Sequence, residues 1–267
     1  MKHCLLGPIW GDICGVPYEF ANERERNPAA IDLAHPKRTF SDDTVLTLAV
    51  AKAILERRPY RDTIFELAQA YPDCGFGGRF YLNFVERRNP EPYNSLGNGA
   101  AMRVAPVGWA FNTFEDVLRE AKASAECSHN HPEGIRSAQA VALAIFLARK
   151  GHDRDEIRAA LATTFGDAYA LSDSLPAIRA QALQAGFDET WRAVPPALGV
   201  FLQTETFEDC LRQTIALGCD TDTQACIACS VAEAYYGPDE TLAPQVAAFL
   251  PKDLHNILTA FSAKYGV

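Results

Sequence analysis

The feature that most limits the fold of this chain is the helical spacing of its apolar residues. In residues 44–56 the apolar side chains recur every three or four positions, and Pro59 follows the run. This period is typical of an α-helix with one buried face, and proline ends such a helix. The alternating pattern of a half-buried strand is almost absent from the chain. The sequence therefore predicts an all-α fold.

The same period marks further helices along the chain. We expect them at residues 61–71, 113–125, 133–149, 153–163, 175–185, 206–218, 221–236, 241–249 and 253–264. The helix at 133–149 is apolar over most of its surface, which predicts a central position. Long stretches without this period lie at 17–41, 72–99, 127–133 and 164–174. Because long loops inside a compact domain are usually functional or disordered, we expect a site among them within one domain, residues 1–267.

Composition excludes several classes of protein. The 267 residues are 48% hydrophobic and 22% charged, which is typical of a globular chain with a large core. The net charge of −9 argues against binding to long nucleic acid and leaves room for cations. No apolar run is long enough to span a membrane, and the N-terminus fails as a signal peptide. The eight cysteines are then expected to be reduced thiols in a cytoplasmic protein.

Two acidic clusters come directly before apolar helices, at residues 41–44 (SDDT) and 220–223 (DTDT). One interpretation is helix capping, because carboxylates stabilise the positive end of a helix. The other is an oxygen ligand set for Mg²⁺, Mn²⁺ or Ca²⁺, shared between the clusters if they converge. Lys37 and Arg38 offer a neutralising partner to the first cluster, but no basic residue lies within seven positions of the second. Spacing alone leaves both interpretations open.

Other polar runs also carry two interpretations. Glu19 follows a segment broken by glycines and Pro17, and is either a surface residue or part of a ligand site. The Gly- and Asn-rich residues 95–99 precede a helix, as in an ordinary turn or in a loop whose N–H groups bind a diphosphate. Cys226 and Cys229 resemble half of a zinc or redox motif, but without a second ligand pair they predict buried thiols.

Taken in order, these motifs resemble the ADP-ribosylglycohydrolase family, from about Cys4 to Gly237. The motifs that carry the resemblance are Gly11-Asp12-x-x-Gly15-x-Pro17-x-Glu19, Ser41-Asp42-Asp43-Thr44, Gly97-Asn98-Gly99-Ala100-Ala101-Met102-Arg103, Ser128-His129 and Gly218-x-Asp220-Thr221-Asp222-Thr223. Each motif is weak by itself, and the ordered set is specific.

The resemblance implies a compact orthogonal bundle of helices around a central cleft that holds two divalent cations, Mg²⁺ or Mn²⁺. By the family pattern, the metal ligands are Ser41, Asp42, Asp43, Asp220, Asp222 and Thr223. The residues expected to hold ADP-ribose are Ser95, Gly97, Asn98, Gly99 and His129. Three residues depart from the pattern: Leu96 replaces an aromatic residue that packs on the adenosine, for which Tyr93 is a substitute, Cys219 replaces a glycine, and Gln224 stands where an apolar residue is common.

The family activity is hydrolysis of the bond between C1″ of the distal ribose and an acceptor, through an oxocarbenium-like transition state. A carboxylate then serves as general acid or base, and the candidates are Glu19, Asp42 and Asp43. The implied partners are an ADP-ribosylated protein or small molecule, with no membrane and a monomeric chain. The alternative is a binding protein that captures ADP-ribose or an ADP-ribosylated target without chemistry.

Overall fold

The computed structural model describes residues 3–19, 27–171, 174–185 and 190–267. The α-helices are α1 (Leu6–Gly15), α2 (Asp42–Glu56), α3 (Tyr60–Ala70), α4 (Gly78–Phe80), α5 (Gly99–Met102), α6 (Ala105–Ala110), α7 (Phe114–Glu126), α8 (Pro132–Arg149), α9 (Arg154–Phe165), α10 (Leu175–Ala185), α11 (Val194–Gln203), α12 (Phe207–Ile215), α13 (Thr221–Tyr236), α14 (Leu242–Ala247) and α15 (Lys252–Tyr265). Shorter turns are η1 (Val16–Tyr18), η2 (Pro28–Ala30), η3 (Tyr81–Glu86), η4 (Asp167–Tyr169) and η5 (Trp191–Ala193). In the described ranges β-pairing is limited to a bridge between Gly97 and Thr190.

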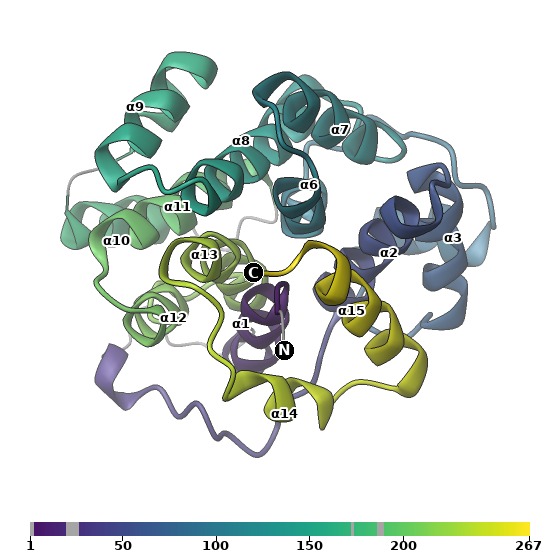
Figure 1. Cartoon of the computed structure of the whole chain (residues 1–267), viewed down its shortest axis with the longest axis horizontal. Helices are drawn as coiled ribbons and strands as arrows, with labels where there is room; N and C mark the ends of the chain where they lie inside the picture. Colours follow the sequence, from purple (N-terminus) through teal and green to yellow (C-terminus); the bar gives the residue numbers. More distant parts are fainter. Residues whose placement is uncertain (1–2, 20–26, 172–173, 186–189) are drawn as a thin grey trace.

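The predicted all-α class is confirmed, and helices cross at the centre of the molecule in Figure 1. Helix α8 is buried along most of its length, as its apolar composition predicts, and α13 is buried from Thr221 to Ala234. The two ends of the chain meet, since the backbones of His3 and Val267 hydrogen-bond to each other (Figure 1). None of the described helices is long and apolar enough to cross a bilayer.

Helix α1 was not among the predicted helices, because Gly11, Gly15 and Pro17 were interpreted as breaking a helix. The structure shows that three glycines at four-residue intervals form its contact with α13. A Cβ atom on each would lie 2.4 Å from a backbone atom of α13: Gly7 faces Cys229, Gly11 faces Ala225 and Gly15 faces Asp222. Only glycine permits such an approach, so the backbones of these two helices touch. The end of α1 is thereby placed against the start of α13.

The prediction that 72–99 is entirely loop was wrong. Residues 78–86 form α4 and the π-helical turn η3, on which Phe80 and Phe84 stack at 4.3 Å between ring centroids. Phe76 extends this stack at 4.8 Å from Phe80. Burial of three aromatic rings stabilises a segment too short to show a clear helical period. The remaining loops, 72–77 and 87–98, border the site described next.

Candidate functional site

The start of α2 is fixed by a buried carboxylate from α1. Ser41 caps the helix by accepting a hydrogen bond from the Asp43 N–H, at 3.2 Å. Asp12 is fully buried, and its Oδ2 accepts hydrogen bonds from the Ser41 N–H at 3.0 Å and the Thr44 N–H at 3.1 Å. The capping interpretation of this cluster is therefore correct, since Ser41 and Asp12 together accept from the Ser41, Asp43 and Thr44 N–H groups. The carboxylates of Asp42 and Asp43 are not needed for the cap and can contact other groups.

The second acidic cluster meets the first. The Thr223 hydroxyl donates to Asp43 Oδ2 at 3.2 Å, across 180 positions of sequence. Thr223 N–H donates to Asp222 Oδ1 at 2.9 Å, which orients that carboxylate at the start of α13. The Thr221 hydroxyl donates to the Gly15 carbonyl at 2.9 Å and ties this helix start to α1. The close packing of α1 on α13 is what brings the two clusters together.

Glu19 joins the second cluster just beyond the end of α1. Carboxylate oxygens of Glu19, Asp220 and Asp222 all lie within 4.8 Å of one another. Asp220 and Asp222 are each only 5% exposed, whereas Glu19 is half-buried. Three carboxylates at this separation form a donor set that suits a hard divalent cation.

The aspartates of the two clusters are not paired with basic side chains. Among the described residues, no Lys or Arg forms an ion pair with Asp12, Asp42, Asp43, Asp220 or Asp222. Arg38, the basic neighbour in sequence, lies over the Trp10 ring at 5.4 Å. One oxygen of Asp12 and one of Asp43 are buried without a hydrogen-bond partner among the described residues. Buried, unpaired carboxylate oxygens fit a bound cation, because leaving them unsatisfied is costly.

Burial has a consistent effect on these carboxyl groups. It raises the pKa of Asp12 to about 6, and hydrogen bonds from Thr44 and Ser41 oppose the rise. Removal from water, followed by the charge of neighbouring carboxylates, raises the pKa of Asp42, Asp43 and Asp222 well above the usual range. The pKa of Asp220 is also raised, chiefly by burial. A cation would reverse this effect by favouring the ionised forms.

The loop before α5 is coupled to the acidic clusters. The Asn98 side-chain N–H₂ donates to Asp220 Oδ2 at 2.7 Å. Within the loop, the Gly97 N–H donates to the Ser95 hydroxyl at 3.2 Å. A Cβ at Gly99 would lie 3.0 Å from His129 Nε2, so the loop rests directly on that ring. His129 is 5% exposed and follows α7.

One cleft of about 810 Å³ collects every residue that the motifs predicted. It is lined by Glu19, Ser41, Asp42, Asp43, Ser95, Gly97, Asn98, Gly99, His129, Asp220, Asp222 and Thr223. The lining also includes residues that sequence reasoning did not select, among them Asp73, Arg79 and Tyr93. Asp12, buried against the start of α2, was missed as a functional position although it lies inside the first motif.

The three departures from the family pattern have visible structural settings. Leu96 is 37% exposed and does not line the cleft, whereas Tyr93 does. Cys219 has a φ of 65°, a conformation that a glycine would adopt more easily. Gln224 is buried, and its side-chain N–H₂ donates to the Gly218 carbonyl at 3.0 Å, which stabilises the turn before α13.

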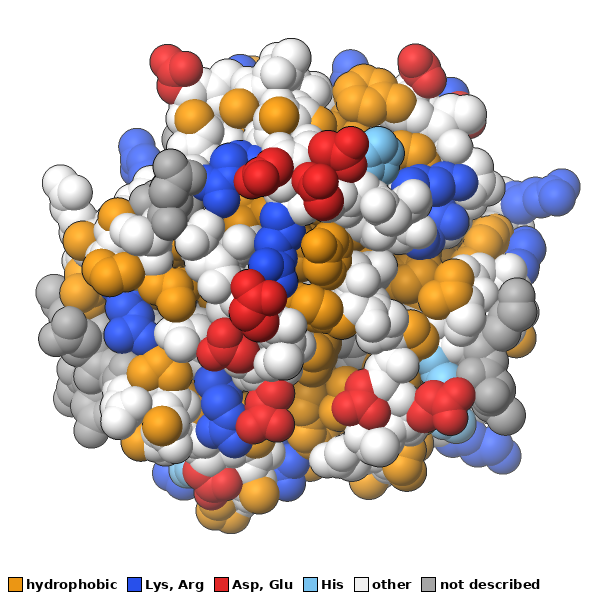
Figure 2. All heavy atoms as spheres, turned by 60° about the vertical axis from the view of Figure 1, so that its left-hand side comes forward, with side chains coloured by type: hydrophobic (Ala, Val, Ile, Leu, Met, Phe, Trp, Pro, Cys, Tyr) orange, Lys and Arg blue, Asp and Glu red, His pale blue; other side chains and the backbone are white. Residues whose placement is uncertain are grey.

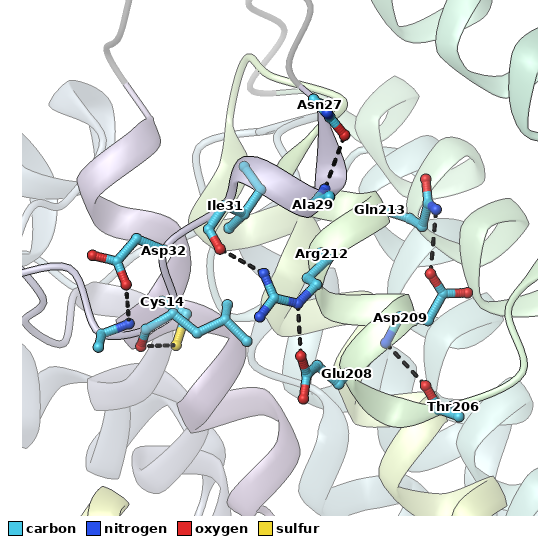
Figure 3. A network of polar contacts seen from close by, with 12 residues as sticks. Cys14, Asn27, Ala29, Ile31, Asp32, Thr206, Glu208, Asp209, Arg212 and Gln213 are labelled. Carbon is cyan, nitrogen blue, oxygen red and sulfur yellow. Dashed lines mark hydrogen bonds and ion pairs between the residues drawn. The ribbon is translucent and has the colours of Figure 1, made fainter.

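A second hollow, of about 690 Å³, lies where α1, α12 and α14 border residues 31–34. Its polar groups already pair with each other, as Figure 3 shows for Arg212. That guanidinium donates to Glu208 at 2.7 Å and to the Ile31 carbonyl. These contacts attach the segment before α2 to α12, so we place the candidate site in the larger cleft.

Comparison with known proteins agrees with the geometry. A family model described as ADP-ribosylglycohydrolase matches residues 1–258. ADP-ribosylhydrolase ARH3 of Mus musculus is 27% identical over 90% of this chain and 84% of its own length, and that of Homo sapiens is 27% identical over 90% and 86%. A solved structure described as an ADP-ribosylglycohydrolase-related protein complex shares the fold with a TM-score of 0.69, at 23% identity over 97% of this chain and 95% of that one. The chain therefore belongs to the ADP-ribosylglycohydrolase family and is an enzyme of the glycohydrolase class.

Proposed function

We propose that this enzyme cleaves the glycosidic bond at C1″ of ADP-ribose and releases ADP-ribose from a modified acceptor. The observation that carries the proposal is the contact between Thr223 and Asp43, which joins the two acidic helix starts in one cleft. The ADP-ribosylhydrolase ARH3 proteins, which this chain resembles over most of its length, bear the name of such an activity. The acceptor we propose is a protein side chain, such as arginine, or a group on a small molecule.

We assign two divalent cations, Mg²⁺ or Mn²⁺, to the acidic end of the cleft. The proposed ligands are Ser41, Asp42, Asp43, Asp220, Asp222 and Thr223. The buried, unpartnered oxygen of Asp43 and the close carboxylates of Asp220 and Asp222 support this assignment. Bound there, the cations would supply Lewis-acid stabilisation and a template for the ribose hydroxyls.

The carboxylates that we assign to proton transfer are Glu19, Asp42 and Asp43. Each lines the cleft, and Glu19 is the most open to solvent of the acidic trio it forms with Asp220 and Asp222. A partly exposed carboxylate can exchange protons with water between turnovers, which general acid–base catalysis requires. Glu19 therefore has the setting of a proton carrier.

The other end of the cleft suits the diphosphate. Ser95, Gly97, Asn98 and Gly99 line the cleft beside His129, and the Asn98 side chain connects this loop to Asp220. A substrate held there would place its distal ribose toward the carboxylates. Binding energy gained on the diphosphate can then be used to orient the reacting carbon.

We further propose that the protein acts on a compact modified substrate in the cytoplasm. On the face seen in Figure 2, basic side chains lie interleaved with acidic ones and do not gather into one patch. This supports a compact modified substrate over long nucleic acid, which needs a continuous basic surface. The cysteines are free thiols, six of them buried, which supports the cytoplasm as its location. We keep the monomer, and a single domain over residues 1–267, as expectations.

The proposal is tested by measuring ADP-ribose release from arginine-, serine- and base-linked substrates, with Mg²⁺ and with EDTA. We expect release from at least one substrate, lost with EDTA and lost in Asp222→Asn. The matched control is Asp116→Asn, a half-buried acid in the first turn of α7 that pairs with Arg119 outside the cleft. Stoichiometric binding of ADP-ribose without release from any substrate would instead favour the binding protein.

A further inference from the structure

A charged side chain is completely buried beneath the substrate loop. Arg103 follows α5 and has no exposed surface. Its Nη2 donates to the Ser124 carbonyl and to the Ser128 hydroxyl, both at 2.8 Å. Its Nε and Nη1 find no hydrogen-bond partner among the described residues. A buried guanidinium is costly to desolvate, so its position calls for a functional explanation.

The hydrogen bonds of Arg103 determine which atom donates in the hydrogen bond between Ser128 and His129. A guanidinium can only donate, so Ser128 Oγ is the acceptor in its bond with Arg103. Ser128 Oγ also lies 2.7 Å from His129 Nδ1. The described residues offer the serine hydrogen no second acceptor, so it points to Nδ1. His129 Nδ1 is then an acceptor, and in a neutral ring the proton resides on Nε2.

Electrostatics acts in the same direction. Burial, followed by the charges of Arg103 and Arg79, holds the pKa of His129 well below its usual range. Tyr93, whose ring centroid lies 6.0 Å from that of His129, is uncharged at neutral pH, and burial raises its pKa further, to about 12. Arg103, Arg79 and Tyr93 bring no negative charge to the His129 ring, so the neutral imidazole is favoured over the imidazolium.

The protonated nitrogen faces the substrate loop. His129 Nε2 lies next to Gly99, where a Cβ would approach it to 3.0 Å, and His129 lines the cleft beside Ser95 and Asn98. A hydrogen-bond donor at this point complements an oxygen with lone pairs and no proton. The opposite tautomer would present a lone pair and repel such an oxygen.

We propose that Arg103 is a positioning residue that acts through Ser128 and fixes His129 as the neutral tautomer with its proton on Nε2, ready to donate to a diphosphate oxygen of the substrate. This inference rests on the proposed function for the identity of the ligand. The chain of bonds from Arg103 to His129 does not depend on it. Arg103 has no exposed surface and does not line the cleft, so its effect is to select which atom of His129 carries the proton.

The tautomer is tested by ¹⁵N NMR of the histidine-labelled full chain in Mg²⁺, with the His129 signals assigned by their loss in His129→Gln. We expect a protonated Nε2 and an unprotonated Nδ1 that stay unchanged between about pH 5.5 and 8. In Ser128→Ala the two nitrogens should move toward averaged shifts, and Ser128→Thr should restore the original pattern. The matched control is Ser137→Ala, a buried serine whose hydroxyl donates to the Gly134 carbonyl. A proton on Nδ1, or an imidazolium at pH 7, would overturn the inference.

Binding of ADP-ribose, measured by calorimetry, gives the functional readout. Ser128→Ala should weaken it by about tenfold, the effect of one hydrogen bond, while Ser128→Thr should bind as the wild type. His129→Gln retains a side-chain N–H and should bind more tightly than His129→Leu. Arg103→Met should show the same averaged His129 nitrogen shifts as Ser128→Ala. If Arg103→Met does not fold, the result for Ser128→Ala alone tests the relay. Unchanged affinity and tautomer in Ser128→Ala would refute the relay, whereas wild-type protein that binds no ADP-ribose but keeps the tautomer would refute only the proposed ligand.

Discussion

Removing divalent cations should destabilise the folded protein through the repulsion of its own carboxylates. Oxygens of Glu19, Asp220 and Asp222 lie within 4.8 Å of one another. Two unit charges at that distance repel by about 3.5 kcal/mol at an effective dielectric constant near 20. Asp42 and Asp43 add to this repulsion, since the charge of Asp220 is among the causes that raise their pKa. The metal-free site therefore opposes folding by several kcal/mol unless it binds protons.

The expected gain from cation binding follows from mass action. A cation at one hundred times its dissociation constant stabilises the fold by about 2.7 kcal/mol. At roughly 2–4 °C per kcal/mol for a chain of this size, the melting temperature should rise by about 5–11 °C. The assay is thermal unfolding at pH 7.5 in EDTA and in a series of Mg²⁺ and Mn²⁺ concentrations.

Substitution at the site distinguishes cation binding from a nonspecific salt effect, because the variant and the wild type should change order of melting temperature between EDTA and Mg²⁺. Asp222→Asn removes one of the crowded charges, so it should melt at or above the wild type in EDTA and below it in Mg²⁺. Asp116→Asn should keep the full response to Mg²⁺, because Asp116 does not line the cleft and is paired with Arg119. Equal melting temperatures of the wild type in EDTA and in saturating Mg²⁺ would refute the reasoning.

Two further predictions concern packing and pH. Gly11→Ala should destabilise the protein by about 3 kcal/mol in urea unfolding, because its Cβ would lie 2.4 Å from the Ala225 carbonyl oxygen. Gly78→Ala, with no atom within 4 Å of its Cβ, should change stability little, and a similar loss in both variants would contradict the packing argument. In EDTA the melting temperature should fall as the pH rises from about 4 to 7, because burial raises the pKa of Asp12 to about 6 and of Glu233 to about 7, so the folded state holds more protons than the unfolded state. A melting temperature that rises over this range in EDTA would show that these carboxyl groups are ionised in the folded state.

The residues that the motifs singled out line one cleft, although no single motif could be told from an ordinary helix cap or turn. The start of α7 shows why a local pattern is insufficient. Thr113 caps that helix and Glu115 and Asp116 follow, just as Ser41 precedes Asp42 in α2. The α7 acids form an ordinary cap at the surface, with Glu115 exposed and Asp116 half-buried, whereas Asp43 of α2 contacts a second cluster. Only the ordered set of motifs distinguished the two cases, since convergence is a tertiary property.

The elements that sequence reasoning missed owe their structure to contacts between distant segments. Gly7, Gly11 and Gly15 favour loops by intrinsic propensity, and the helix they form depends on its fit to α13. Asp12 fixes the start of α2 because its carboxylate accepts from the Ser41 and Thr44 N–H groups, a contact that no spacing rule reveals. A four-residue glycine interval was the available signal, because it places all three on one helix face.

The most direct test of the central claim is anomalous scattering from crystals of the full chain grown with Mn²⁺. We expect two peaks in the cleft, with oxygens from both the Ser41–Asp43 and the Asp220–Thr223 segments at about 2.1 Å. Such a map would show that two acidic helix starts from distant parts of the chain hold a shared pair of ions. A map without Mn²⁺ at this cleft, or with an ion held by one segment while the other faces away, would contradict the account.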